Sequence, residues 1–389
     1  MNNPANLSKS FCVMPWVAIA TDPRGGLYPC CWMDRYSKYQ GPAEGYKDSD
    51  YLKQIKQDFL EGRYPATCKK CEWNDKSGLV SKRTRENDAW FKKHRIEELD
   101  DQKYDILDLR LSNKCNLSCV TCFPGDSSAI FEETKKHYPN TLDHYMRSMS
   151  IVEGLNLTTP YNGEDIDYFI SNIKPHSRVY FTGGEPGLVK PVADILDRLI
   201  DMGYNTTVSL DFNSNFQALN QKWFDKLKLF KGTMLASVDA VGARAELIRY
   251  GCKWESVDRN VRSFIDQCTN FNLVVSPTPS ILNIFYLNEI VDWTKDLKNE
   301  NRVSLTFQNR LSIPGYLDLK NLPEELKSKA TQRVNEITMG HYRQDLAKHL
   351  AQQTEVGGWE NFIFNMDKLD KIRGTSWREV LPDLNFNNN

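Results

Sequence analysis

Three cysteines stand close together in this sequence, at Cys115, Cys119 and Cys122. Three thiolates on one short loop can bind three of the four irons of a [4Fe–4S] cluster, which leaves the fourth iron open to a small molecule. A structural zinc site is the alternative, but zinc in such sites normally has four ligands. Because no fourth Cys or His lies near this loop, the spacing favours an iron–sulfur cluster.

A second candidate site is the run Gly183-Gly184-Glu185-Pro186, which follows a predicted strand. Two glycines allow a ligand to approach the backbone closely, because no Cβ is in the way. Backbone carbonyls and the Glu185 carboxylate can accept hydrogen bonds from an ammonium group. Such a run alone is typical of a strand-to-helix turn. Combined with the cysteine loop, it predicts a site for the amino group of S-adenosylmethionine (SAM), whose amino and carboxylate groups can chelate the open iron.

The chemistry of this combination belongs to the cofactors, and the protein supplies their placement. An electron passing from the reduced cluster into the sulfonium of SAM would break a carbon–sulfur bond. The product would be a 5′-deoxyadenosyl radical, which is a strong hydrogen-atom abstractor. No catalytic side chain can be assigned from the sequence, and the six histidines show no ligand spacing.

Five more cysteines lie near the N-terminus. They are Cys12, Cys30, Cys31, Cys68 and Cys71. Four of them could close around a metal, with one ligand coming from the adjacent pair. A zinc ion would stabilise this segment, and a [4Fe–4S] cluster would do so and also carry electrons. The two remaining cysteines are interpreted as structural, Cys268 on the apolar stripe of a helix and Cys252 in a turn.

The elements that must position these residues begin near Tyr104, where strands and helices start to alternate. Predicted strands are Ile106–Leu111, Arg178–Thr182, Thr206–Phe212, Thr233–Val238, Leu273–Pro277 and Val303–Gln308. The periodicity predicts helices around 192–199, 257–268 and 285–297. Such alternation predicts an α/β fold with a parallel sheet, either open or curled into a partial barrel. The cysteine loop would then lie at the C-terminal end of the first strand, which is the catalytic face of parallel barrels.

Three regions follow from this pattern: residues 1–103, 104–312 and 313–389. The first is Cys-rich and turn-rich, with a predicted hairpin turn at Asp22–Gly26, helices near Tyr51–Glu61 and Asn87–Leu99, and little apolar content. Its charged run Lys82–Glu86 is predicted to be a solvated face, with contact to a substrate carboxylate as the alternative. An insertion at 124–174 is expected to carry substrate contacts. The last region is predicted to be a helical extension.

The cysteine loop and the Gly183–Pro186 turn, in this order, resemble the radical SAM superfamily over roughly Tyr104–Leu311. The resemblance implies a partial (β/α)6 barrel with SAM held across the C-terminal ends of the strands. It makes the three loop cysteines the cluster ligands and Gly183–Pro186 the motif for the SAM amino group. Polar residues at later strand ends resemble contacts to the ribose or carboxylate of SAM, although turn or capping roles explain them equally well. These residues are Asn213, Ser237, Asp239 and Arg249.

The N-terminal cysteines resemble the auxiliary-cluster module called twitch, a shortened relative of the SPASM domain. That module usually follows the barrel, whereas here the cysteines precede it. The resemblance favours a second [4Fe–4S] cluster over zinc. It implies Cys12, Cys68 and Cys71 as ligands, with Cys30 preferred over Cys31 as the fourth.

The predicted function is therefore that of a radical SAM enzyme that abstracts a hydrogen atom from a peptide, a protein or a small molecule. The expected reductant is a flavodoxin or ferredoxin. A non-catalytic iron–sulfur or zinc-stabilised protein, serving electron transfer or binding, is the alternative. The 389 residues carry a formal net charge of −1 and no long apolar run, which argues against nucleic-acid and membrane partners. The N-terminus lacks the features of a signal peptide, so a cytoplasmic location is expected.

Overall fold

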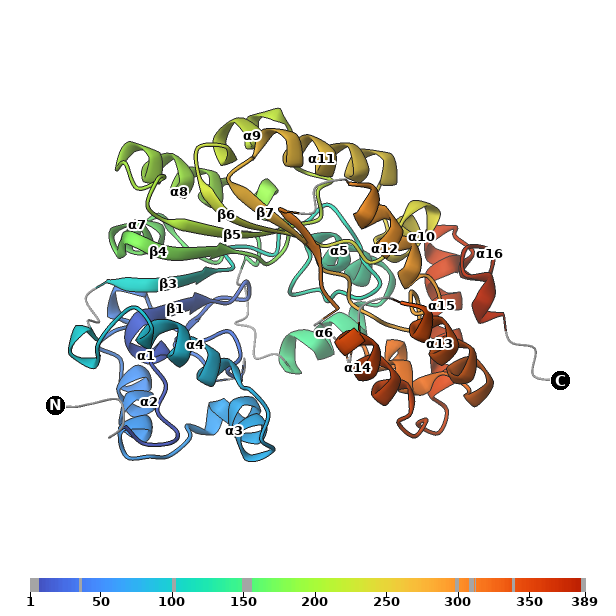
Figure 1. The fold of residues 1–389 in the computed structure, drawn as a ribbon, viewed down its shortest axis with the longest axis horizontal. Coiled ribbons are helices and arrows are strands. Elements are labelled where there is room, and N and C mark those ends of the chain that lie inside the picture. Colours follow the sequence, from blue (N-terminus) through green and yellow to red (C-terminus); the bar gives the residue numbers. More distant parts are fainter. Residues whose placement is uncertain are drawn as a thin grey trace. The chain divides into compact units, whose positions relative to one another are not determined.

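A computed structural model describes residues 7–34, 37–99, 103–148, 156–297, 301–307, 311, 313–337 and 340–385 (Figure 1). Two predicted boundaries lie outside these residues. They are Gln308, the end of the sixth predicted strand, and Ser312, the end of the predicted barrel region.

The strands form one sheet in the order β2-β1-β3-β4-β5-β6-β7-β8. Their bounds are β1 Ala18–Thr21, β2 Leu27–Tyr28, β3 Tyr104–Leu109, β4 Ile173–Phe181, β5 Ser209–Ser214, β6 Lys231–Ala236, β7 Phe271–Val275 and β8 Val303–Leu305. Strands β1 and β2 pair antiparallel, and β1–β3, β3–β4, β4–β5 and β7–β8 are parallel pairs. The predicted α/β class with a mostly parallel sheet is confirmed. All six predicted strands are present, and β1 and β2 are additions from the N-terminal segment.

The described helices are α1 Met14–Val17, α2 Asp50–Leu60, α3 Lys69–Lys76, α4 Lys82–Phe91, α5 Ser128–His137, α6 Pro139–Ser148, α7 Gly163–Ser171, α8 Lys190–Asp201, α9 Gln221–Leu227, α10 Gly242–Ile248, α11 Trp254–Gln267, α12 Leu287–Asp296, α13 Glu324–Glu336, α14 Gly340–Leu350, α15 Gly358–Arg373 and α16 Trp377–Val380. Helix α8 buries Val192, Ile195, Leu196 and Leu199, the stripe that predicted it. The predicted helical C-terminal region is also confirmed. None of the described helices has the length and apolar composition needed to cross a membrane.

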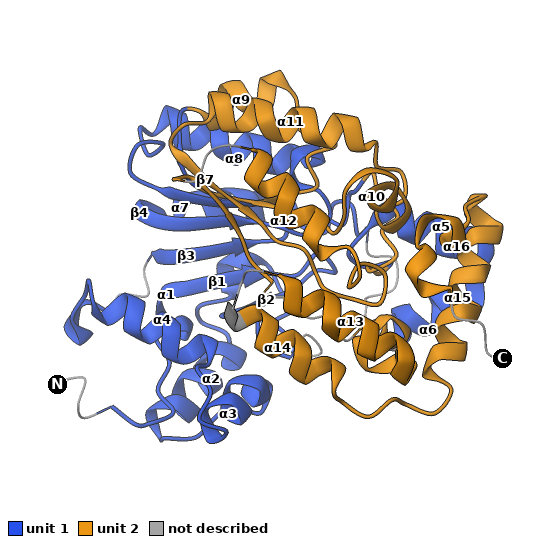
Figure 2. Cartoon of the chain, turned by 45° about the vertical axis from the view of Figure 1, so that its right-hand side comes forward, with its two compact units in different colours: residues 1–115, 124–212, 229–232 blue, residues 116–123, 213–228, 233–389 orange. Residues whose placement is uncertain are grey.

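The chain divides into two compact units, coloured separately in Figure 2. Unit 1 comprises 1–115, 124–212 and 229–232, and unit 2 comprises 116–123, 213–228 and 233–389. The predicted boundary at 103/104 does not coincide with this division, because β1 pairs with β3 in register from Ala18 opposite Ile106. The N-terminal segment is thus built into the sheet of unit 1.

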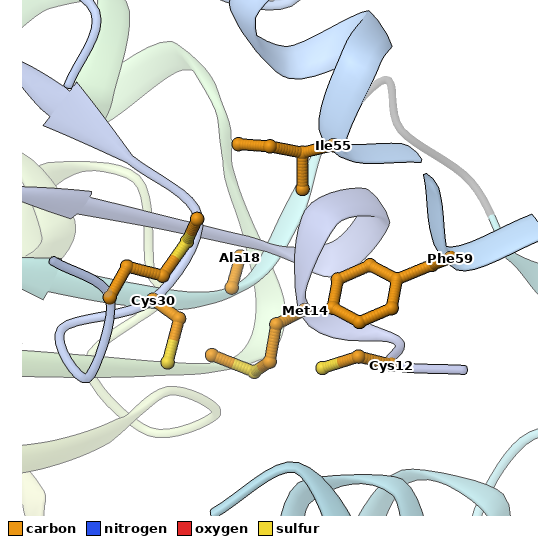
Figure 3. Close-up of a cluster of buried hydrophobic side chains, with 7 residues drawn as sticks. Cys12, Met14, Ala18, Cys30, Ile55 and Phe59 are labelled. Atoms are coloured by element: carbon orange, nitrogen blue, oxygen red, sulfur yellow. The ribbon is translucent and has the colours of Figure 1, made fainter. Parts of the chain in front are cut away.

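The N-terminal segment has a core of its own, contrary to the expectation of thin apolar content. One buried cluster contains Cys12, Met14, Ala18, Cys30, Met33, Ile55 and Phe59 (Figure 3). A second contains Phe11, Val13, Val17 and Trp90. Successive residues of the short stretch 11–14 thus enter two different clusters. The alternation is too brief to be recognised in the sequence as a core.

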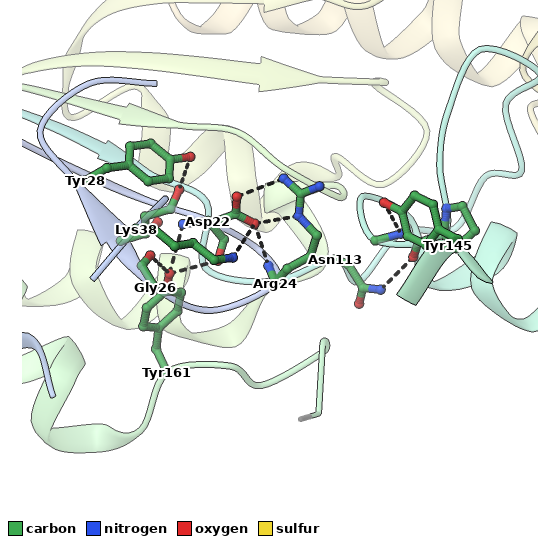
Figure 4. Close-up of polar contacts among 11 residues, drawn as sticks. Asp22, Arg24, Gly26, Tyr28, Lys38, Asn113, Tyr145 and Tyr161 are labelled. Atoms are coloured by element: carbon green, nitrogen blue, oxygen red, sulfur yellow. Dashed lines mark hydrogen bonds and ion pairs between the residues drawn. The ribbon is translucent and has the colours of Figure 1, made fainter. Parts of the chain in front are cut away.

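The predicted hairpin turn at Asp22–Gly26 joins β1 to β2. The Asp22 carboxylate accepts hydrogen bonds from Arg24 Nε at 2.7 Å and Nη2 at 2.8 Å, and both side chains are almost completely buried (Figure 4). Tyr161 Oη lies 2.8 Å from the carbonyl oxygens of Asp22 and Gly26. The 124–174 insertion is therefore attached to the N-terminal hairpin within unit 1.

Candidate functional site

The Gly183–Pro186 turn is seated on the backbone that leads into the cysteine loop. Glu185 N–H donates a hydrogen bond to Lys114 O at 2.8 Å. Gly184 has φ +47°, and a Cβ at that position would lie 2.4 Å from Lys114 O and 2.8 Å from Asn113 C. Such distances are incompatible with any side chain, so glycine is required both for the backbone conformation and for the close approach. Two segments about 70 residues apart are thus held in contact at the C-terminal ends of neighbouring strands β3 and β4.

The loop itself is attached on both sides. In unit 1, Cys115 N–H donates to Ser128 Oγ at 3.1 Å, at the start of α5. In unit 2, Ser118 N–H donates to Tyr250 O at 2.9 Å and Val120 N–H to Ile248 O at 2.8 Å. Cys115 and Cys122 are half-buried and Cys119 is buried. The unit division falls directly after Cys115. The loop backbone up to Cys115 is therefore fixed by a hydrogen bond within unit 1, and the backbone after it by hydrogen bonds within unit 2.

Two of the predicted polar strand-end residues meet next to Cys119 in unit 2. Arg249 Nη2 forms an ion pair with Asp239 Oδ2 at 2.8 Å, and Arg249 Nη1 lies 3.9 Å from Cys119 Sγ. Burial raises the pKa of the Cys119 thiol, and the Arg249 cation opposes this rise. A cation beside a buried thiol favours the thiolate form that an iron ligand requires.

The other predicted strand-end residues, Asn213 and Ser237, lie at the ends of β5 and β6. Ser237 N–H donates to Ser214 O at 2.9 Å, which links these two ends within unit 2. Next to them, Asn215 Nδ2 donates to Asn116 Oδ1 at 3.0 Å, and Asn116 belongs to the cysteine loop. This segment therefore has a supporting role toward the loop, and its contact with SAM stays a prediction.

The N-terminal cysteines are divided between two environments. Four of them line one pocket, together with apolar and aromatic side chains. These cysteines are Cys12, Cys30, Cys68 and Cys71. Cys31 does not line this pocket, and its Sγ accepts a hydrogen bond from Lys82 Nζ at 3.1 Å. The four thiols predicted as ligands thus line the same pocket, whereas the Cys31 side chain lies outside its lining and contacts both Lys82 and the neighbouring Cys30.

Helix α4 positions two of these thiols. Arg83 donates to Phe11 O at 2.8 Å, next to Cys12, and its Nε donates to Asp75 on α3 at 2.8 Å. Helix α3 carries Cys71 and begins directly after Cys68. The predicted solvated face at Lys82–Glu86 is therefore wrong for its inward side, because the side chains of Lys82, Arg83 and Glu86 are all at most 15% exposed.

The four cysteines that line the pocket are free cysteines in the structure. Burial raises the pKa of Cys12 far above its ordinary value and that of Cys68 to about 12, so both would be neutral thiols without a cation nearby. No group of three or more His, Cys, Asp or Glu side chains in the described ranges stands in metal-ligating geometry. Metal binding by the four thiols would therefore require a change in their positions.

Four charged residues on the sheet were not predicted from the sequence as part of a site. They are Asp108, Arg110, Arg178 and Asp211. The signal was available, because Leu107-Asp108-Leu109-Arg110-Leu111 alternates apolar and charged residues with the period of a strand. The two cysteines interpreted as structural, Cys252 and Cys268, are both buried, and Cys268 is completely inaccessible to solvent.

No protein-family model matches the chain, and no curated protein sequence matches it. Among solved structures, it is similar to anSMEcpe with bound AdoMet, with 17% identity, TM-score 0.41 and coverage of 62% of this chain and 61% of that chain. It is also similar to Streptococcus suis SuiB bound to S-adenosylmethionine, with 13% identity, TM-score 0.35 and coverage of 90% and 70%. A third structure is TYW1 with a lysine–pyruvate adduct bound, with 13% identity, TM-score 0.28 and coverage of 62% and 70%.

The match to anSMEcpe thus spans less than two thirds of that protein's length. All three TM-scores are below 0.5, so these likenesses carry no assignment of function.

Proposed function

We propose that this chain is a radical SAM enzyme that takes a hydrogen atom from its substrate. The observation that supports this most directly is the seating of the Gly183–Pro186 turn on the backbone entering Cys115. A turn that merely connects a strand to a helix does not need a glycine packed so closely that a Cβ would lie 2.4 Å from the carbonyl oxygen of Lys114, next to the cysteine loop. Such close packing is needed when the turn presents its backbone groups to a ligand bound at the cysteine loop.

In this proposal Cys115, Cys119 and Cys122 hold three irons of a [4Fe–4S] cluster. Backbone groups of Gly183–Glu185 bind the amino group of SAM, and Arg249 balances the charge at Cys119. When bound, the cluster would supply one electron to SAM, which gives methionine and a 5′-deoxyadenosyl radical. Hydrogen-atom transfer from the substrate would then yield 5′-deoxyadenosine and a substrate radical. A flavodoxin or ferredoxin is the proposed source of the electron.

We also propose that Cys12, Cys30, Cys68 and Cys71 hold an auxiliary [4Fe–4S] cluster. Their shared apolar pocket supports a soft metal group with four thiolate ligands. Zinc is compatible with the same donors, and its lack of redox chemistry distinguishes it. The auxiliary cluster would accept an electron from the substrate radical or bind the substrate.

The decisive experiment is anaerobic reconstitution with iron and sulfide, followed by addition of SAM and dithionite and chromatographic measurement of 5′-deoxyadenosine. Wild type should form this product, and a Cys115/Cys119/Cys122→Ala variant should not. Failure of a fully loaded, SAM-binding wild type to form it, with and without candidate substrates, would favour a non-catalytic iron–sulfur protein.

Iron analysis tests the auxiliary site separately. Wild type should contain about 8 irons, and the triple variant about 4. A triple variant that retains no iron but contains one zinc would establish the zinc alternative for the N-terminal cysteines.

A further inference from the structure

The sheet of unit 1 has one apolar face and one charged face. On β3, β4 and β5 the apolar face is formed by completely buried side chains such as Leu107, Val179 and Leu210. The intervening residues point to the opposite face, because side chains alternate along a strand. The register places Asp108 opposite Tyr180, and Tyr180 opposite Asp211. A row of polar side chains therefore runs across three neighbouring strands.

Side chains of the N-terminal segment meet this charged face. Arg178 Nη2 lies 3.2 Å from Glu86 Oε1, and Arg178 Nε lies 3.8 Å from Asp211 Oδ2. Lys82 donates to Cys31 at 3.1 Å and lies 4.0 Å from Glu86. The charges of Lys82, Arg178, Glu86 and Asp211 are thus satisfied among themselves and by Cys31.

Arg110 differs from the other cations on this face. The closest carboxylate oxygen to its Nε is Asp108 Oδ1 at 3.6 Å, which is an ion pair without a hydrogen bond. Both of these atoms are buried and have no hydrogen-bond partner. The backbone N–H of Arg110 is used, since it donates to Thr21 Oγ1 at 2.6 Å. The backbone of Arg110 is therefore held in place, while the Nε donor of its guanidinium stays unused.

Leaving buried donors and acceptors unsatisfied is costly, so this arrangement calls for a ligand that satisfies them. A guanidinium presents its donors in a planar fork that matches both oxygens of a carboxylate. The nearby Asp108 Oδ1 can accept one hydrogen bond. The complementary ligand therefore has a carboxylate and, next to it, a hydroxyl or ammonium group.

We propose that the charged face of unit 1 binds the substrate as a hydroxy acid or amino acid, through a carboxylate on Arg110 and a hydroxyl or ammonium group on Asp108. This assignment rests on the proposed function and specifies the chemical class of the substrate. The two side chains that would bind it are largely buried, with exposed fractions of 9% for Asp108 and 18% for Arg110.

The test measures binding in full-length, anaerobically reconstituted protein saturated with SAM and without reductant. Equilibrium dialysis with radiolabelled L-lactate and L-alanine provides the probes, and lactamide provides the probe without a carboxylate. Wild type should retain both acids and not lactamide. Arg110→Met should weaken their binding on the order of 10- to 100-fold, because charge-assisted hydrogen bonds are lost. Arg110→Lys keeps the positive charge but loses the planar pair of donors, so its affinity for the acids should lie between those of wild type and Arg110→Met.

Arg198→Met is the matched control, because Arg198 lies on α8 with its side chain 55% exposed. It should bind the acids as wild type does. Circular dichroism verifies that each variant is folded. Equal binding to wild type and Arg110→Met, binding of inorganic phosphate in preference to the acids, or no binding of either acid to wild type would overturn the proposal.

SAM binding separates this proposal from the proposed function. Arg110→Met should bind SAM as wild type does. A loss of SAM binding in this variant would assign Arg110 to SAM and overturn the substrate assignment while leaving the proposed function intact. A wild type that binds the acids but never SAM would overturn the proposed function instead.

Discussion

Replacing Gly184 by alanine should disturb the cysteine loop without touching a cysteine. An L-residue at φ +47° costs about 1–2 kcal/mol. The new Cβ would also collide with backbone atoms of Asn113 and Lys114, and overpacking of this kind costs about 1–3 kcal/mol. Together, Gly184→Ala should lower the free energy of unfolding by about 2–5 kcal/mol.

Gly203→Ala is the matched control. Gly203 has φ +70°, at the end of α8 in the same unit, but a Cβ there would meet no atom within 4 Å. The free energy of unfolding of this variant should fall only by the cost of the backbone conformation, about 1–2 kcal/mol. The difference between the two variants isolates the contact with the loop.

Two measurements check this prediction. Urea denaturation of the metal-free proteins, followed by circular dichroism, compares their stabilities. Anaerobic reconstitution then compares iron content and SAM binding, which Gly184→Ala should reduce and Gly203→Ala should not. Equal destabilisation by both variants, with equal iron and SAM binding, would refute the close contact between the turn and the loop.

Three further perturbations have defined outcomes. Burial would raise the pKa of Asp22, but the hydrogen bonds and charge of Arg24 outweigh burial and lower it. Its stabilising contribution is therefore present above the unfolded-state value near 4 and is lost as the pH falls through the folded-state pKa. Asp22→Asn should cost about 3–5 kcal/mol in urea denaturation at pH 7, and a loss that persisted undiminished at pH 2 would contradict this. Cys30→Ser should lower the iron content from about 8 to about 4, whereas Cys31→Ser should leave it unchanged; the reverse would exchange their assignments. Trp377→Ala should cost about 3–5 kcal/mol, because this side chain is 1% exposed. Unchanged thermal unfolding would mean that the C-terminal helices do not stabilise unit 2.

The strands from β3 to β8 were predictable because apolar residues either alternate or run continuously between turn residues. Strand β1 was not, since Ala18–Thr21 is short and buried on both faces, so it shows no alternation. Its place in the sheet comes from pairing with β3, a contact between residues 88 positions apart in the sequence. Local patterns contain no information about such pairing.

The choice between Cys30 and Cys31 shows the same limit on a smaller scale. Both residues follow Tyr28-Pro29, and either could supply the fourth thiol by spacing alone. The turn directs Cys30 toward the pocket and leaves Cys31 with Lys82, 51 residues further along the chain. The cysteine spacing and the glycine-rich turn were recognisable because their chemistry is local, whereas the direction of a side chain in an irregular turn depends on distant partners.

The division of the chain has a consequence for its biosynthesis. Unit 1 begins at the N-terminus, but its last segment is Leu229–Gly232. At roughly 5–20 residues per second, at least about 10 seconds separate the synthesis of Cys12 from that of Gly232. During this interval the early cysteines leave the ribosome on an unfinished unit. Translation in an oxidising mixture would expose these cysteines to premature disulfide formation. The yield of correctly folded protein should therefore depend more on the redox potential during synthesis than on the redox potential of a later refolding buffer.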